Sequence, residues 1–436
     1  MKTLLVTIVV FAAAVNEIQA QDSLYLTLDE VIALALKNNV DVSASDLRAQ
    51  SSEFAVKEAS GNFLPKVTLN GSYNRNIDKQ VIFLPEGFGG GGATRIGLNN
   101  NFTTSLDLSV PVYSRQFQAT KAYSDRNREL LTETYRGTRQ SVVNNIRKLY
   151  FQRVAALEVI KVREKALANA LENSANIENK LLIGTATEFD KAMARVKVKV
   201  AQNNLLDAEK QAALANNNLK VVIGIDVHTR LNLADSLALS PNEEVAGDDA
   251  RNFSRNSTLR QSALQEQLAQ QQLDITKAAY YPTVSAVGSY QYQSQQNDFN
   301  FGDYRWVKTS YVGLKLQLPV FNGMVTRSKA QQAAYNQKIA RLQNQYTARS
   351  LESQMKQVLT ELRYSREKVD LQKENVAVSE TALALTKERY NFGKGTFIEV
   401  SNAELDLVSA RLNYLQAVLE YKSAFYDYQL LIGSEN

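Results

Sequence analysis

The sequence has no cysteine, one histidine and four methionines among its 436 residues. The absence of cysteine excludes disulfide bonds, thiolate metal sites, cysteine nucleophiles and lipid attachment through an N-terminal cysteine. His228 has no second histidine with which to hold a metal ion. Carboxylates alone can catalyse glycoside hydrolysis, but no α/β or barrel pattern surrounds a carboxylate pair in this chain. The composition therefore predicts neither an enzyme nor a protein that carries a cofactor.

Long apolar runs are missing after the first residues, and the mean hydropathy is −0.30. A mature chain of this kind could enter a membrane only as a β-barrel, because every backbone polar group must be satisfied in lipid. The net charge of +5 is spread along the sequence, whereas nucleic-acid binding needs a concentrated basic stripe. Nucleic acid is therefore not expected as a partner.

Residues 1–20 have the pattern of a secretory signal peptide. Lys2 supplies a basic start, an apolar stretch follows from Leu4 to Val15, and the small residue Ala20 marks the expected cleavage site. The alternative is a membrane anchor, but about 12 apolar residues are too few for the roughly 20 that span a bilayer. We expect the mature chain to begin at residue 21.

What the sequence does contain is a duplication. The segment 64–73 returns as 281–290, with Pro65 matched by Pro282, and the segment 108–113 returns as 316–321. This predicts a first structural repeat over 21–226, a connector over 227–256 and a second repeat over 257–436. A repeat that mixes strands with long helices indicates an architecture rather than an active site.

Four segments alternate between apolar and polar residues, which is the period of a β-strand. They cover about 66–77 and 101–112 in the first repeat, and about 283–294 and 309–320 in the second. Strands of this length with one apolar face fit transmembrane β-strands, although a half-buried soluble hairpin alternates in the same way. Because about eight strands are needed to close a barrel, four would need a partner sheet or further copies of the chain.

Each strand pair is followed by a predicted helix of exceptional length, over about 114–182 and 323–391. A helix of nearly 70 residues is roughly 100 Å long, and it survives only by packing lengthwise on other helices, as in a coiled coil. Glycine-containing turns at 183–187 and 392–396 precede a second helix in each repeat. The pattern predicts two long antiparallel helical hairpins.

Taken together in order, these elements resemble the TolC family of outer membrane efflux proteins. The resemblance rests on the opening Leu26–Leu36 followed by Asn38-Asn39, on Leu64-Pro65-x-Val67, on the x-Pro-Val-aromatic elements at Pro111 and Pro319, and on the glycine-containing turns. It implies an α+β membrane protein with an internal two-fold repeat. It also implies that three copies of the chain form a homotrimer. In this trimer the helical hairpins form an α-barrel, and four transmembrane strands per protomer contribute to a twelve-stranded β-barrel.

The resemblance also implies a function. The chain would be a passive export duct in the outer membrane of a Gram-negative bacterium, in contact with outer membrane lipid and with its helical part in the periplasm. Its partners would be a periplasmic adaptor protein and an inner-membrane pump, of the RND type or the ABC type. The cargo, whether drug, metal ion or protein, is not set by this chain.

In this family the periplasmic end closes like an iris, and alignment on the turn glycines carries four gate positions to this chain. The candidate gate residues are Asp190, Tyr390, Glu399 and Asn402. The turn residues expected to contact the adaptor or the pump are Gly184, Thr185, Gly393, Lys394 and Gly395. Two positions depart from the family pattern: Gly395 replaces a latching arginine of some members, and Asn402 replaces a second acidic residue.

Electrostatics gives the gate a direct rationale. Three copies of Glu399 around a narrow axis would repel one another and attract cations. The alternative for Asp190 and Glu399 is helix capping, because carboxylates favour a helix N-terminus. Tyr390 could equally be a solvated residue at a helix end.

A second reading of the whole chain is a periplasmic coiled-coil adaptor or scaffold without channel activity. Adaptors also have signal peptides and helical hairpins, but they usually have one hairpin flanked by compact β domains. The duplicated strand–helix order argues for the duct.

Overall fold

The computed structural model describes residues 24–84, 92–239 and 253–434. The expected signal peptide and residues 240–252 of the expected connector lie outside the described residues. The chain forms two compact units. We call residues 1–47, 134–260 and 347–436 the helical unit, and residues 48–133 and 261–346 the sheet unit.

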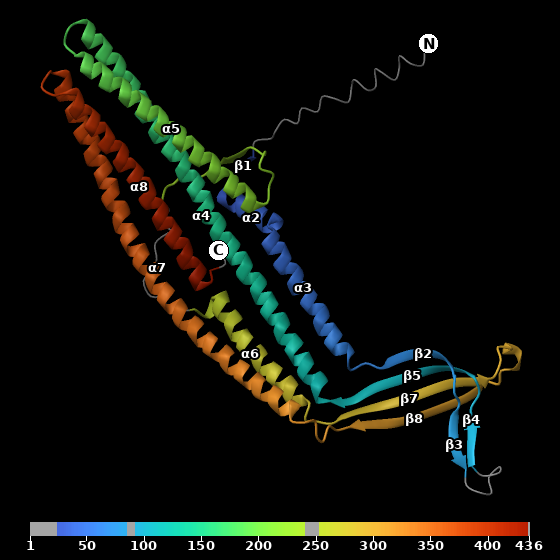
Figure 1. Ribbon diagram of the computed structural model, residues 1–436. Helices are drawn as coiled ribbons and strands as arrows, with labels where there is room; N and C mark the ends of the chain where they lie inside the picture. Colours follow the sequence, from blue (N-terminus) through green and yellow to red (C-terminus); the bar gives the residue numbers. More distant parts are fainter. Residues whose placement is uncertain (1–23, 85–91, 240–252, 435–436) are drawn as a thin grey trace, which may run out of the picture. The chain divides into compact units, whose positions relative to one another are not determined.

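The order of elements follows the duplication (Figure 1). The helices are α2 (Leu28–Asn38), α3 (Val40–Gly61), α4 (Arg115–Leu182), α5 (Glu188–Ile223), α6 (Ser257–Ala278), α7 (Val325–Asn391) and α8 (Phe397–Ile432), with 3₁₀ turns η3 (Phe253–Arg255) and η4 (Phe301–Asp303). The strands are β1 (Leu24–Leu26), β2 (Lys66–Arg75), β3 (Gln80–Leu84), β4 (Gly92–Ile96), β5 (Asn100–Ser114), β6 (Leu231–Leu233), β7 (Thr283–Gln296) and β8 (Val307–Gln317).

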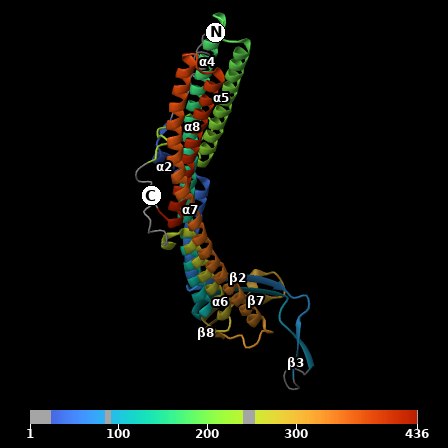
Figure 2. The same cartoon turned by 90° about the vertical axis from the view of Figure 1, so that its left-hand side faces the viewer.

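In the helical unit, α4 with α5 and α7 with α8 form two antiparallel hairpins that lie side by side in both views (Figure 2). The main apolar core of this unit is built where α2, α4, α5, α7 and α8 meet. Its most enclosed side chains are those of Val31, Ile146, Tyr150, Leu219, Ile223 and Val418. Burial of this apolar surface holds the hairpins together.

Tyr150 closes this core with a polar contact. Its hydroxyl donates to the Asp235 carboxylate at 2.7 Å and lies 3.3 Å from the Leu26 carbonyl. Leu26 belongs to β1, which pairs in parallel with β6. Burial, with the hydrogen bond to Asp235 second, raises the pKa of the Tyr150 hydroxyl. The ring stays neutral, and it ties the first strand and the connector to α4.

Both hairpins turn in the same way. Gly184 and Gly393 take positive φ angles of 74° and 72°, which glycine adopts without steric cost. The second helix of each hairpin then begins at a threonine N-cap, Thr187 for α5 and Thr396 for α8. The repeated turn sequence therefore produces a repeated turn geometry.

In the sheet unit, β2, β5, β7 and β8 form an antiparallel sheet in that order. The register is continuous except near Pro111, where the pairing of β5 with β7 shifts. β8 ends at Gln317, before the expected boundary near 320, because Pro319 has no N–H to donate to a ladder. The hairpin of β3 and β4, inside the segment 77–100, was not predicted.

No helix among the described residues is long and apolar enough to cross a membrane.

Candidate gate at the ends of the helical hairpins

Asp190 and Glu399 occupy equivalent places in the two hairpins, at the third position of α5 and of α8. The Asp190 carboxylate accepts hydrogen bonds from the Thr187 backbone N–H at 3.0 Å and hydroxyl at 2.7 Å. Glu399 accepts a longer one, 3.5 Å, from the Thr396 backbone N–H. Each threonine hydroxyl accepts from the carboxylate residue's own backbone N–H. Both residues therefore complete capping boxes.

Asp190 and Tyr390, the candidate gate residues on α5 and α7, have separate partners within one chain. In the described part of the chain, no hydrogen bond joins the two side chains. The ring of Tyr390 instead lies under the ammonium group of Lys180, with 3.7 Å between Nζ and the ring centroid. This cation–π contact joins α4 to α7, the first hairpin to the second.

The other predicted residues lie on the surface of the hairpin ends. Asn402 is exposed on α8. Gly184, Thr185, Gly393 and Lys394 are exposed in the two turns, and Gly395 is half-buried. Arg389 Nη2 is 4.0 Å from the Glu399 carboxylate. The turns are therefore on the surface, and Glu399 is held within its own hairpin by Thr396 and Arg389.

Three α4 residues that sequence reasoning missed hold the hairpins together near these turns. We call Asn173, Ile177 and Lys180 the α4 stripe, because their spacing places them on one face of the helix. Each meets the second hairpin: Lys180 stacks on Tyr390 as described, Ile177 packs with Phe397, and Asn173 reaches Glu404.

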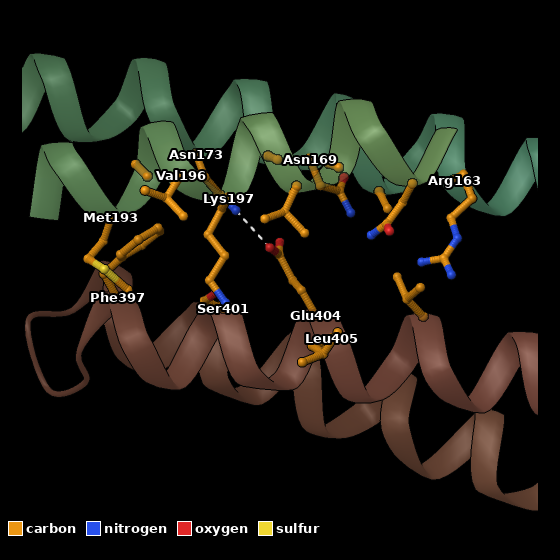
Figure 3. Close-up of a pocket in the computed structure, with 17 residues that line it drawn as sticks. Arg163, Asn169, Asn173, Met193, Val196, Lys197, Phe397, Ser401, Glu404 and Leu405 are labelled. Atoms are coloured by element: carbon orange, nitrogen blue, oxygen red, sulfur yellow. Dashed lines mark hydrogen bonds between the residues drawn. The ribbon is translucent and has the colours of Figure 1, made fainter. Parts of the chain in front are cut away.

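Glu404 is the polar centre of this contact (Figure 3). Its carboxylate accepts a hydrogen bond from the Asn173 side-chain amide at 2.8 Å and pairs with Lys387 of α7 at 2.9 Å. The Glu404 side chain is only 16% exposed. Because a half-buried charge that loses its partners is costly, this carboxylate favours the arrangement in which α4, α7 and α8 stay together.

Next to Glu404 lies a cavity of about 330 Å³ between α4, α5 and α8. Apolar side chains from α5 and α8 form much of its wall, and Arg163 and Lys197 bring two cations to it. Ile177, Ala194 and Phe397 form a small buried cluster at the turn end of the same seam. The hairpins are thus closely packed at this cluster and incompletely packed beside it.

Among the described residues, no group of three or more histidine, cysteine, aspartate or glutamate side chains could hold a metal ion.

A profile of the family described as outer membrane efflux protein matches residues 31–225 and 251–434, once for each repeat. The chain belongs to this family. It is an outer membrane efflux channel of the kind used in tripartite efflux pumps, it is not an enzyme, and it is located in the outer membrane of Gram-negative bacteria. Channels of the TolC family form trimers. The reading as a periplasmic adaptor is therefore wrong.

Individual relatives are distant in sequence and close in fold. Outer membrane protein TolC of Escherichia coli (strain K12) is 22% identical over 430 residues, which span 91% of this chain and 81% of that protein. The solvent efflux pump outer membrane protein SrpC of Pseudomonas putida is 23% identical, over 89% and 81% of the two chains. The Campylobacter jejuni CmeC outer membrane channel superposes with a TM-score of 0.76 at 20% identity, over 94% and 87%.

Proposed function

We propose that three copies of this outer membrane efflux protein form a passive export duct whose periplasmic end is closed by the hairpin turns. An inner-membrane pump, of the RND or the ABC type, would deliver cargo, and a periplasmic adaptor would connect pump and duct. The exposed turn residues Gly184, Thr185, Gly393, Lys394 and Gly395 would make those contacts. The family and the trimers of its channels support this proposal.

In this proposal the gate has two kinds of contact. Between copies, Glu399 and Asn402 would face the axis, where three Glu399 carboxylates would repel one another. Asp190 and Tyr390 would hold the turns in shape through their contacts with Thr187 and Lys180. Within each copy, the α4 stripe would hold the second hairpin against the first.

The observation that carries the gate is the contact of Asn173, Glu404 and Lys387, because it joins three helices of both hairpins. An iris that opens by moving one hairpin must break it. The ion pair of Arg411 with Glu380, at 2.6 Å, joins only α7 and α8 of the second hairpin. It would travel with that hairpin and would not resist opening.

Single-channel recording in planar bilayers tests this difference. Glu404→Gln removes the charge held by Lys387, and we expect a several-fold higher conductance because the closed state loses a contact in every copy. Glu380→Gln is the matched control, an acid-to-amide change in an ion pair inside one hairpin. Equal conductance of the wild type and both variants would remove the Glu404 contact from the gate.

The lack of cysteine in the chain permits a second test. Asn173→Cys combined with Glu404→Cys places two thiols where a hydrogen bond now joins the hairpins. We expect the oxidised double variant to lose conductance in planar bilayers, and a reductant to restore it. Conductance that continues with the disulfide formed would contradict a gate that opens between these residues.

A further inference from the structure

Asp107 is the only carboxylate in the four strands of the main sheet, β2, β5, β7 and β8, all of which lie in the described part of the chain. It sits near the middle of β5 and is paired across the ladder with Thr68 of β2 and Ser289 of β7. Directly paired residues present their side chains on the same face of a sheet. The neighbours on this rung are therefore hydroxyl side chains, and none carries a charge.

Three donors from three strands fix the position of this carboxylate. One oxygen accepts from the Asn70 amide and the Ser105 hydroxyl, both at 2.7 Å, and the other accepts from the Ser289 hydroxyl at 2.6 Å. No ion pair to Asp107 exists among the described residues. The carboxylate is therefore held rigidly, and its charge is not neutralised by a nearby cation.

The two faces of this sheet differ in polarity. The face that carries Asp107 has serine, threonine, asparagine and glutamine at most of its positions, as in Thr68, Ser105 and Gln291. The other face carries the exposed apolar side chains Leu69, Leu106, Leu108, Val312, Leu314 and Leu316. In a membrane channel of strands, the apolar face meets lipid and the polar face lines the lumen. Asp107 therefore lies on the lumen side.

Only two other charged residues share the polar face of the four strands. Lys66 pairs with Ser109 and Lys315 pairs with Ser285, which places both nearer than Asp107 to the strand ends that join the helices. No charged residue on this face lies between Asp107 and the loop end of the strands. For cargo that travels outward from the helical side, Asp107 is the last charge on the polar face of these four strands.

We propose that the three Asp107 carboxylates of a trimer form a negative ring in the lumen, outward of the lysines, which makes the outer part of the channel favour cations over anions. The inference rests on the trimeric duct and is independent of the gate. The chemical class it favours is cationic cargo. Anionic cargo would pass the lysines and then meet a like charge further out in the lumen.

Reversal potentials across planar bilayers under a salt gradient test this ring. The recordings use the complete trimer in the Glu404→Gln background, so that the gate limits the current less, and near 10 mM salt, where the Debye length is about 30 Å. We expect Asp107→Asn to lower the cation-to-anion permeability ratio about twofold. Near 1 M salt, charges are screened within about 3 Å. We therefore expect the same cation-to-anion permeability ratio with and without Asp107→Asn.

Matched variants separate charge from structure. Ser289→Ala removes one hydrogen bond to Asp107 and leaves the charge, so the ratio should stay that of the Glu404→Gln background. Asp107→Glu keeps the charge and should also preserve the ratio, which covers the case in which Asp107→Asn does not assemble. Lys315→Gln removes a positive charge from the polar face, so it should raise the cation-to-anion permeability ratio.

Two results would overturn the inference. One is an unchanged ratio in assembled Asp107→Asn trimers at low salt. The other is a change in Ser289→Ala as large as that in Asp107→Asn, which would make the effect structural. Assembled protein that conducts in no variant would instead refute the duct itself, so the two failures are distinguishable.

Discussion

The helical unit and the sheet unit satisfy their apolar side chains in different ways. In the helical unit, Ile146, Leu219 and Val418 are fully buried within a single chain. In the sheet unit, every residue of β2 and β8 is exposed, including Leu69 at 72% and Val312 at 89%. One unit has its own core, whereas the other presents an apolar face and two unpaired edges that only lipid and further copies can cover.

The two units therefore use their apolar residues for different purposes within one outer membrane protein. In the sheet unit, apolar residues are concentrated on one face of strands of 10 to 15 residues, a face suited to lipid. The long helices use theirs for packing along the seams of the hairpins. Substitutions in the sheet unit should therefore impair assembly in the membrane, whereas substitutions in the helical unit should lower the stability of each chain.

The largest effect is expected from a charge on the apolar face of the sheet. Leu314→Arg places a guanidinium against lipid, which costs about 2–4 kcal/mol near the middle of a bilayer, and the cost is repeated in each copy. We expect SDS-resistant trimers to disappear from outer membrane fractions. Tyr311→Arg, on the polar face of the same strand, is the control. Equal loss of trimers in both variants would contradict the assignment of the two faces.

A smaller effect, confined to the helical unit, is expected from Ile146→Ala. Removing this fully buried side chain leaves a cavity that costs about 2–5 kcal/mol. We expect a lower thermal midpoint of the helical circular dichroism signal, with trimers still inserted in the membrane. Val378→Ala, at an exposed position of α7, should change the midpoint little. An unchanged midpoint in Ile146→Ala would show that the core described around α4 does not stabilise the unit.

The smallest effect is expected from the capping boxes of the hairpin turns. Thr187→Ala removes the hydroxyl that accepts from the Asp190 backbone N–H, and such a change costs about 1 kcal/mol. Hydrogen exchange at the first turn of α5 should become faster, and exchange in the core around Ile146 should not. Unaltered protection at the Asp190 amide would argue against the cap. Thr396→Ala makes the same comparison at α8.

Much of this fold could be predicted because its elements are long and their periods are clear. About 70 residues without proline predict a helix, and the structure has α4 over Arg115–Leu182. The strand alternation likewise predicts the faces of the main sheet. The hairpin of β3 and β4 escaped prediction because strands of five residues beside a glycine-rich stretch carry too few alternations to stand out.

The candidate site was predictable only in part, for a physical reason. Threonine followed three residues later by an acid is a visible capping signature, and it accounts for the contacts of Asp190 and Glu399 with their own helices. The contact of Asn173 with Glu404 depends on how far one hairpin is shifted along the other. That shift is set by packing along the whole seam, and no local pattern in the sequence encodes it.

The central claim is that the sheet unit is completed by other copies of the chain into a conducting duct. The most direct measurement is planar-bilayer recording from SDS-resistant protein purified from outer membranes, with Glu404→Gln alongside the wild type. The account predicts that the SDS-resistant species has the mass of three chains, that it gives discrete conductance steps, and that the steps are larger in the variant. A monomer that gives no current in either form would contradict it.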